Sequence, residues 1–326
     1  MMQECEIDEV DVLRDGDKVQ LIPSDELSES PPTPSASGSF AARRRRQLSV
    51  TALWEIGREE LELGAQLGEG NFGGVFRAQW RGTAVAVKQL NANFGDSATK
   101  AADDIHEFRK EISLMGMLRH PNIVLFLGAV TKPPGLMLVT EYVAGGDLFA
   151  FLADEQVAIT SKEKVDMALD VCRGMAYLHG FEPPLLHRDL KSSNLLVDPS
   201  RKLKICDFGF ARVKASRQKQ LSAVATGTPQ WMAPEVLSNE PFTEKADVYS
   251  FAIVLWELLS RQRPWSGKNP AEIAMAVTIQ DARPVLPEDA PAKMAELARR
   301  CWVSRPEQRP RFEDLTKELS AFRDTM

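Results

Sequence analysis

The sequence is poor in several features that mark large classes of proteins. It has only four cysteines in 326 residues, and they are far apart and follow no pattern. They form neither the close spacing of a zinc site nor a disulfide framework, which indicates a reducing compartment. These cysteines are Cys5, Cys172, Cys206 and Cys301.

Long apolar runs are absent as well. The longest, from Phe251 to Trp256, stops at Glu257, whereas roughly 20 residues are needed to cross a bilayer. The N-terminus is acidic and has no apolar signal-peptide segment. We therefore expect a cytoplasmic protein without stable membrane insertion.

An excess of basic charge is also missing. The 40 lysines and arginines are outnumbered by 46 acidic residues, which gives a net charge of −6. Proteins that bind nucleic acid usually carry a basic field that attracts phosphates. We therefore expect no nucleic-acid partner.

The first fifty residues form a distinct segment. Residues 1–30 hold ten acidic and two basic side chains, and a Pro/Ser-rich stretch then leads to the basic run Arg43–Arg46. Few apolar residues and blocks of like charge predict disorder over residues 1–50. The basic run is either a solvated charge cluster or a contact for acidic lipid or an import receptor.

From about Trp54 the pattern becomes that of a globular α+β protein. Alternating apolar residues predict antiparallel strands over 61–90, and helical spacing predicts a helix over 101–118. Further strands are expected at 123–127 and 136–142. Helical patterns then dominate, at 163–179, 246–260, 271–280 and 292–302. The helix over 246–260 is apolar almost all round, so we expect it at the centre of a large helical lobe.

A glycine-rich stretch lies at the start of the strand-rich part. Residues 68–75 read Gly-Glu-Gly-Asn-Phe-Gly-Gly-Val, and glycines let a backbone approach phosphates closely. A dinucleotide-binding turn has a similar pattern but opens a helix. The residues after Gly73 alternate like a strand, so we interpret the stretch as a flap over a nucleotide. A plain glycine-rich hairpin is the alternative.

Lys88 and Glu111 form a second candidate pair. Lys88 ends the strand pattern Val-Ala-Val-Lys, thirteen residues after Val75. Glu111 lies on the apolar face of the helix predicted over 101–118, where an unpaired carboxylate would be costly. Lys88 is its natural partner, although a surface lysine is the common alternative. The pair would hold Lys88 toward nucleotide phosphates.

The strongest signal joins two motifs. Residues 187–194 read His-Arg-Asp-Leu-Lys-Ser-Ser-Asn, and Asp-Phe-Gly begins eighteen residues after Asp189. Phosphoryl transfer needs metal ions to neutralise charge and an acceptor to orient the attacking hydroxyl. Asp189 can orient the hydroxyl. Asn194 and Asp207 supply the oxygen ligands that Mg²⁺ prefers.

These motifs, in this order, resemble the protein kinase family over residues 57–323. The resemblance implies a bilobal α+β fold with a small lobe over 57–140, a hinge over 141–147 and a large lobe over 148–323. It implies ATP and Mg²⁺ as cofactors and a protein substrate with a Ser or Thr acceptor. By the same analogy, Glu235 of Ala-Pro-Glu pairs with Arg309.

Three segments look like the tyrosine-kinase-like group, to which Raf-like and mixed-lineage kinases belong. They are residues 80–83, 227–232 and 247–251. Lys191, two residues after Asp189, follows the serine/threonine pattern, and Thr228 should contact Asp189 and Lys191. We therefore expect a serine/threonine kinase in intracellular signalling, with a tyrosine-specific kinase and an inactive pseudokinase scaffold as alternatives.

The resemblance also implies an ATP pocket. Thr140 would stand at its back, Glu141 and Val143 would offer backbone groups to adenine, and Asp147 would reach the ribose. Val75, Ala86 and Leu196 would sandwich the purine ring. The implied ATP-binding residues are Leu67, Gly68, Gly70, Gly73, Val75, Ala86, Lys88, Thr140, Glu141, Val143, Asp147 and Leu196.

The resemblance also implies regulation through the activation segment, and the tail offers further sites. In kinases with an arginine at the position of Arg188, that arginine typically binds a phosphate on the activation segment, for which Ser222 and Thr226 are favoured over Ser216. Upstream kinases would act on the activation segment and on the tail, at Ser30, Thr33 and Ser49. Cys206 would either face the nucleotide or, as we favour, be an unreactive packed thiol.

Overall fold

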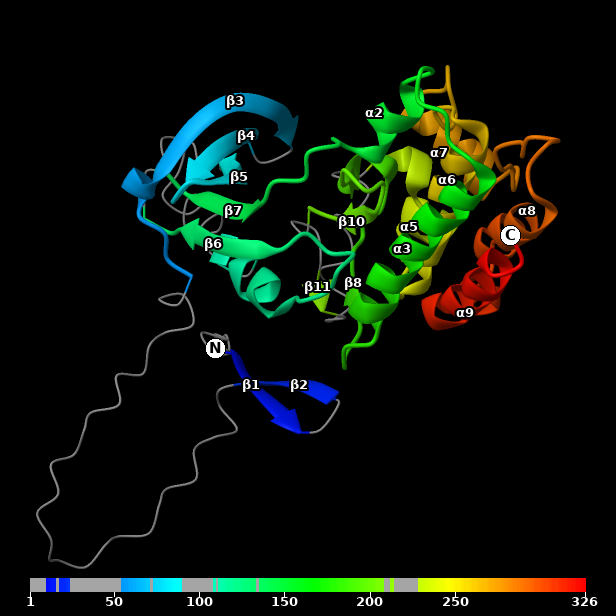
Figure 1. Ribbon diagram of the computed structural model, residues 1–326. Coiled ribbons are helices and arrows are strands. Elements are labelled where there is room, and N and C mark those ends of the chain that lie inside the picture. Colours follow the sequence, from blue (N-terminus) through cyan, green and yellow to red (C-terminus); the bar gives the residue numbers. More distant parts are fainter. Residues whose placement is uncertain are drawn as a thin grey trace, which may run out of the picture.

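The chain forms a strand-rich part and a helical part, which a single stretch after β7 connects (Figure 1). The computed structural model describes residues 10–15, 18–23, 54–70, 73–89, 108–109, 111–132, 135–207, 212–213 and 228–326. These ranges include both lobes that the sequence predicts.

The strand-rich part is a five-stranded antiparallel sheet in the order β3-β4-β5-β7-β6. Its strands are β3 Leu61–Gly70, β4 Gly73–Trp80, β5 Thr83–Gln89, β6 Phe126–Val130 and β7 Met137–Glu141. Arg81 and Gly82 have φ of 49° and 78°, the backbone that a tight two-residue hairpin between β4 and β5 requires.

The two faces of this sheet have different surroundings. Val85, Val87 and Val139 are fully buried in a small apolar cluster on one face. Residues that are paired across antiparallel strands, or two apart along one strand, share a face. Lys88 pairs with Leu138, so both belong to the other face. Leu138 belongs to the same apolar cluster as Ile112 and Met115, and Lys88 contacts Glu111, so the helix over 111–117 lies on the Lys88 face.

The helical part is built around one buried helix. Helix α6, Lys245–Ser260, is buried at nearly every position, as its apolar sequence predicts. The other helices are α2 Leu148–Ala153, α3 Ser161–His179, α5 Pro234–Leu237, α7 Pro270–Thr278, α8 Ala292–Cys301 and α9 Phe312–Arg323. Helix α3 begins at a capping box in which Thr160 and Glu163 exchange hydrogen bonds, and α7 begins at a similar box at Asn269.

Short strands flank the loops at the junction of the two parts. They are β8 Leu185–Leu186, β9 Leu195–Val197, β10 Leu203–Ile205 and β11 Arg212–Val213. Strand β9 pairs with β10, and β8 pairs with β11. These pairs bracket the two motifs that contain Asp189 and Asp207.

One predicted element differs from the structure, and another is described only in part. The strand expected at 123–127 is displaced. Ile205 of β10 accepts the Val124 N–H and donates to the Asn122 oxygen, so Ile123 forms an isolated bridge with Ile205, and β6 begins only at Phe126. The helix expected over 101–118 is seen at 108–109 and 111–117, and residues 101–107 lie outside the described residues.

The N-terminal segment contains a hairpin. Strands β1, Val10–Asp15, and β2, Lys18–Pro23, pair in antiparallel register. This hairpin differs from the disorder that we expect over residues 1–50. The β-branched residues Val10 and Val12 of β1, and Val19 and Ile22 of β2, favour strands, although the overall charge of the segment suggests disorder. The rest of that segment lies outside the described residues. No helix in the described ranges is both long and apolar enough to cross a bilayer.

Candidate active site

Lys88 connects the sheet to both acidic partners. Its Nζ lies 2.8 Å from Asp207 Oδ1 and 3.5 Å from Glu111 Oε1. Burial alone would lower the pKa of Lys88, but the charges of Glu111 and Asp207 outweigh it and raise the pKa to about 12. Burial also raises the pKa of Glu111, against the effect of Lys88. The predicted Lys88–Glu111 pair is present, and Asp207 holds the ammonium more closely.

The loop after β8 gathers a second set of polar groups. Lys191 Nζ lies 2.7 Å from Asp189 Oδ2 and donates to Thr228 Oγ1 at 2.9 Å. Asn194 Nδ2 donates to the backbone oxygen of Asp189 at 2.8 Å and to its Oδ2 at 3.0 Å. The expected contact of Thr228 with Lys191 is therefore present, and Lys191 connects Thr228 to Asp189.

The backbone of both motifs is strained at one position each. Arg188 has φ of 69° and Asp207 has φ of 61°, a region that is costly for residues other than glycine. Asp247, at the start of α6, accepts hydrogen bonds from the backbone N–H groups of His187 and Arg188, both at 2.9 Å. The strained turn at Arg188 is thus fixed from the core.

Asp247 is itself held by His179. The Nε2 atom of His179 lies 2.9 Å from Asp247 Oδ2. Burial would raise the pKa of Asp247, but the hydrogen bond and charge of His179 outweigh it and lower the pKa. Asp247 therefore stays ionised, which suits an acceptor of two backbone hydrogen bonds.

Several expected ATP-binding residues share one face of the sheet. Val75 pairs with Lys88, and Ala86 pairs with Thr140. All four therefore belong to the face that carries Lys88. Leu196 of β9 forms an isolated bridge with Asp147, which attaches β9 to the predicted hinge.

The hinge residues have more specific contacts than the sequence predicts. The Glu141 carboxylate lies 2.7 Å from Lys204 and accepts the Leu125 N–H at 2.8 Å. The Glu141 N–H donates to the Leu125 oxygen, so its backbone can serve adenine only through the carbonyl. Asp147 Oδ1 caps α2 by accepting the Ala150 N–H at 2.8 Å, a role that sequence reasoning missed. Val143 is buried.

The glycine-rich stretch forms the end of the β3–β4 hairpin. Gly68 pairs with Val75, and Gly70 pairs with Gly73. Gly73 has φ of 146°, which a side chain would not tolerate. The prediction of a strand hairpin rather than a strand-to-helix turn is confirmed, although residues 71–72 lie outside the described residues. Leu67 is half exposed beside it.

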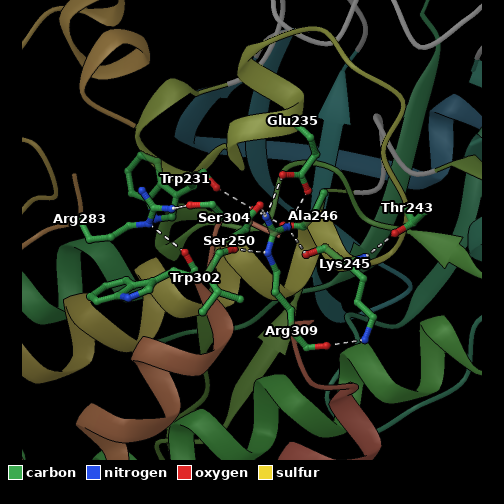
Figure 2. Close-up of polar contacts among 11 residues, drawn as sticks. Trp231, Glu235, Thr243, Lys245, Ala246, Ser250, Arg283, Trp302, Ser304 and Arg309 are labelled. Atoms are coloured by element: carbon green, nitrogen blue, oxygen red, sulfur yellow. Dashed lines mark hydrogen bonds and ion pairs between the residues drawn. The ribbon is translucent and has the colours of Figure 1, made fainter. Parts of the chain in front are cut away.

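The predicted ion pair of the large lobe is present (Figure 2). Arg309 donates to both carboxylate oxygens of Glu235, at 2.6 and 2.8 Å. It also donates to the backbone oxygens of Val303, Ser304 and Lys245. The arginine is fully buried, so this fork fixes α5 to the loop before α9.

Two regulatory predictions lie outside the described residues. Ser222 and Thr226, with Ser216, belong to the undescribed part of the segment before Thr228.

Burial raises the pKa of the Cys206 thiol well above its ordinary value, which favours our interpretation of Cys206 as an unreactive thiol.

A protein-family model described as protein tyrosine and serine/threonine kinase matches residues 61–319. Serine/threonine-protein kinase CTR1 of Arabidopsis thaliana is 46% identical over 258 residues, which are 78% of this chain and 30% of that protein. The probable serine/threonine-protein kinase SIS8 of the same plant is 44% identical over 265 residues, or 81% and 25% of the two chains.

The probable serine/threonine-protein kinase drkD of Dictyostelium discoideum is 45% identical over 262 residues, which are 80% of this chain and 20% of that protein. This chain therefore spans less than a third of the length of these curated relatives. The matching family model covers both tyrosine and serine/threonine kinases, and the relatives are named as serine/threonine kinases. These matches confirm the predicted tyrosine-kinase-like resemblance. The bilobal fold, the paired motifs and these matches agree that the chain belongs to the protein tyrosine and serine/threonine kinase family.

Proposed function

We propose that this chain is a serine/threonine protein kinase that transfers the γ-phosphate of ATP to a protein hydroxyl, with Mg²⁺ as cofactor. The observation that carries the proposal is the position of Lys191, between Asp189 at 2.7 Å and Thr228 at 2.9 Å. A partly buried ammonium beside the acceptor carboxylate can neutralise a transferring phosphate. It also follows the serine/threonine pattern of the catalytic loop.

Asp189 is the proposed catalytic residue for the hydroxyl. Its carboxylate is nearly buried and is held by Lys191 and Asn194, so its orientation is fixed before a substrate arrives. Such a carboxylate accepts the hydrogen of the serine or threonine hydroxyl and aims its oxygen. The catalytic role is thus mainly one of orientation, as phosphoryl transfer requires.

Asp207 and Asn194 fit a magnesium site. Both side chains offer oxygen atoms, and a hard cation prefers such ligands. In the described ranges no group of three or more His, Cys, Asp or Glu could hold a metal by itself. Phosphate oxygens would therefore have to complete the coordination, as expected for a metal that arrives with a nucleotide. When bound, Mg²⁺ would neutralise the charge on the phosphates.

The remaining residues would bind ATP. Lys88 would face the phosphates, held by Asp207 and Glu111. Val75, Ala86 and Leu196 would enclose adenine, with Thr140 behind it. The Glu141 carbonyl and the Val143 backbone would pair with its edge, and Leu67 with Gly68, Gly70 and Gly73 would cover the phosphates. Asp147 would have to exchange its capping contact to reach a ribose.

Several broader proposals remain with the function. The kinase domain would span residues 57–323, with the hinge at 141–147 and a separate tail over 1–50. The protein would act in cytoplasmic signalling on protein substrates, with neither a nucleic-acid partner nor stable membrane insertion. Upstream kinases would modify the tail and the activation segment. These are proposals about the whole protein, because the chain matches only part of the length of its relatives.

The test is transfer of radiolabelled phosphate from ATP to an arrayed peptide library. Phosphoamino-acid analysis should find label on serine and threonine, and Asp189→Asn should abolish it. Label on tyrosine alone would support the tyrosine-specific alternative. Binding of ATP without transfer by the purified wild-type chain would support the pseudokinase.

A further inference from the structure

Helix α6 contains one acidic residue that its position does not explain. Glu257 is 1% exposed and lies in an otherwise apolar stretch of the helix. A buried carboxyl is costly unless it has partners. Asp247, the other buried acid of the helix, supports the strained turn at Arg188, whereas Glu257 has partners of its own.

Glu257 contacts two segments of the active site. Ser192 Oγ lies 2.7 Å from its Oε1, and Trp231 Nε1 donates to its Oε2 at 2.8 Å. Ser192 follows Lys191 directly, at the start of the turn Ser192–Asn194. Trp231 ends the turn Pro229–Trp231, three residues after Thr228. One carboxyl therefore joins Ser192, the neighbour of Lys191, to Trp231, which closely follows Thr228. Lys191 and Thr228 are themselves in contact.

The same helix holds Trp231 at a second point. Ser250 Oγ donates to the Trp231 backbone oxygen at 2.8 Å (Figure 2). With both its indole N–H and its carbonyl bonded to α6, Trp231 has little freedom to shift. Ser192 has its hydroxyl bonded to the same helix. Helix α6 is thus the common base on which the two segments are aligned.

We propose that Glu257 is a positioning residue that fixes the spacing between the loop of Lys191 and the segment of Thr228. This rests on the proposed function, because the Lys191–Thr228 contact matters only where phosphate is transferred. Glu257 does not touch the reacting groups and acts through Ser192 and Trp231. Its loss would widen the 2.9 Å contact and leave Lys191 less well aimed at the phosphate.

The electrostatics favour a hydrogen-bonding role over an ionic one. Burial raises the pKa of Glu257 to about 8, and the hydrogen bonds from Ser192 and Trp231 only partly oppose it. No charged side chain among the described residues contributes to that shift. A protonated carboxyl donates through one oxygen and accepts through the other. Ser192 Oγ can accept, and Trp231 can only donate, so both contacts persist in this form.

A glutamine reproduces this neutral pattern and a leucine does not. Glu257→Gln should keep kcat within about twofold, because its amide can donate to Ser192 and accept from Trp231. Glu257→Leu should lower kcat about tenfold or more, since a displacement of about 1 Å can cost on the order of 100-fold. The KM for ATP should not change, because Glu257 contacts no residue proposed to bind the nucleotide.

A matched control separates positioning from general loss of stability. Leu255→Ala truncates a fully buried side chain two residues away, on roughly the opposite side of α6. It should lower the melting temperature, yet leave kcat per folded molecule unchanged. Trp231→Phe, which removes only the indole N–H and the second ring, should lower kcat in the same direction as Glu257→Leu. The two changes should be non-additive.

Hydrogen exchange gives a readout that does not depend on activity. In Glu257→Leu the amides of residues 190–194 and 228–232 should exchange faster than in the wild type, and in Leu255→Ala they should not. If Glu257→Leu retains full kcat, or loses no more than Leu255→Ala does, with unchanged exchange, the proposal is wrong. If the wild-type chain transfers no phosphate, the proposed function fails, and the exchange comparison alone decides whether Glu257 aligns the segments.

Discussion

The ammonium of Lys88 lies closer to Asp207, at 2.8 Å, than to the Glu111 carboxylate on the neighbouring helix, at 3.5 Å. All three side chains are largely buried, so removal of one leaves charge without compensation. Asp207 also has a backbone conformation that is costly for aspartate. The site therefore holds a strained aspartate, which is the proposed metal ligand, in direct contact with a lysine.

Asp207→Asn should abolish phosphoryl transfer and leave the fold intact. The change removes the charge of the proposed Mg²⁺ ligand, and loss of one such electrostatic contact lowers turnover by about 100-fold or more. Turnover and the thermal unfolding midpoint are measured on the same preparation. Asp324→Asn, at a position 73% exposed near the end of α9, is the control and should change neither. Near-normal turnover of Asp207→Asn would remove this residue from the metal site.

Lys88→Met should impair transfer more than Glu111→Ala does. The methionine loses the contacts with both carboxylates, whereas the alanine loses only the longer one. The two effects should be strongly non-additive, because both remove the same ion pair. A double-mutant cycle on kcat/KM measures this coupling. Strictly additive losses would show that Glu111 acts independently of Lys88.

Removal of one partner from the buried pair of Glu235 and Arg309 should cost more stability than removal of one partner from an exposed pair. Glu235→Gln leaves the Arg309 charge unbalanced in the core, which costs about 3–5 kcal/mol. Asp166→Asn makes the same chemical change in a pair with Arg323 whose side chains are 41% and 44% exposed, and it should cost about 1 kcal/mol or less. Urea unfolding at constant pH compares them. Equal losses would mean that the buried fork has no special role.

The candidate catalytic residues could be named from the sequence because the proposed chemistry restricts the residue types that can serve. Asp189, Asn194 and Asp207 lie in short motifs whose spacing is local, and only a few residue types bind Mg²⁺ or orient a hydroxyl. The pairing of Glu235 with Arg309 was predicted from family resemblance, since 74 residues separate them. Local spacing patterns do not indicate contacts between residues that are so far apart in the sequence.

Other features depend on partners that are remote in the sequence. Glu257 bonds to side chains 65 and 26 residues away, and its only local signal was an acid inside an apolar helix. The start of β6 was misplaced because an apolar run does not indicate where strand pairing begins, and Ile205 of another strand decided it. Asp147 was expected to bind ribose, yet an Asp directly before a helix is also a common N-cap.

Phosphorylation of Ser222 or Thr226 should activate the enzyme. Arg188 lies in the motif of residues 187–194. Its guanidinium would bind such a phosphate through charge-assisted hydrogen bonds and so hold the activation segment in place. Phosphatase treatment should lower activity, and preincubation with MgATP should restore it. A Ser222→Ala/Thr226→Ala double variant should be less active and insensitive to phosphatase. Full activity of that variant would rule the mechanism out, and Ser216→Ala serves as the comparison.

The stability of the protein should also report on the protonation of Glu257. Its folded-state pKa is raised to about 8 from an ordinary 4.5, because the carboxyl is buried. The contribution of the neutral carboxyl is fully present below pH 4.5. It is lost as the pH rises toward 8, because the unfolded chain ionises there while the folded one keeps its proton.

Glu257→Gln cannot ionise, so it should gain stability relative to the wild type as the pH rises from 4.5 to 8, with no further gain above about 8. Urea unfolding of both proteins across this range measures the difference. Glu318→Gln is the control of opposite sign, since hydrogen bonding to Arg300 lowers the pKa of Glu318 to about 2. Its difference from the wild type should be constant above about pH 6 and should shrink only as the pH falls below 4.5. A flat Glu257→Gln difference between pH 5 and pH 8 would mean that the buried carboxyl is ionised in the folded protein, and that its two hydrogen bonds are those of a carboxylate.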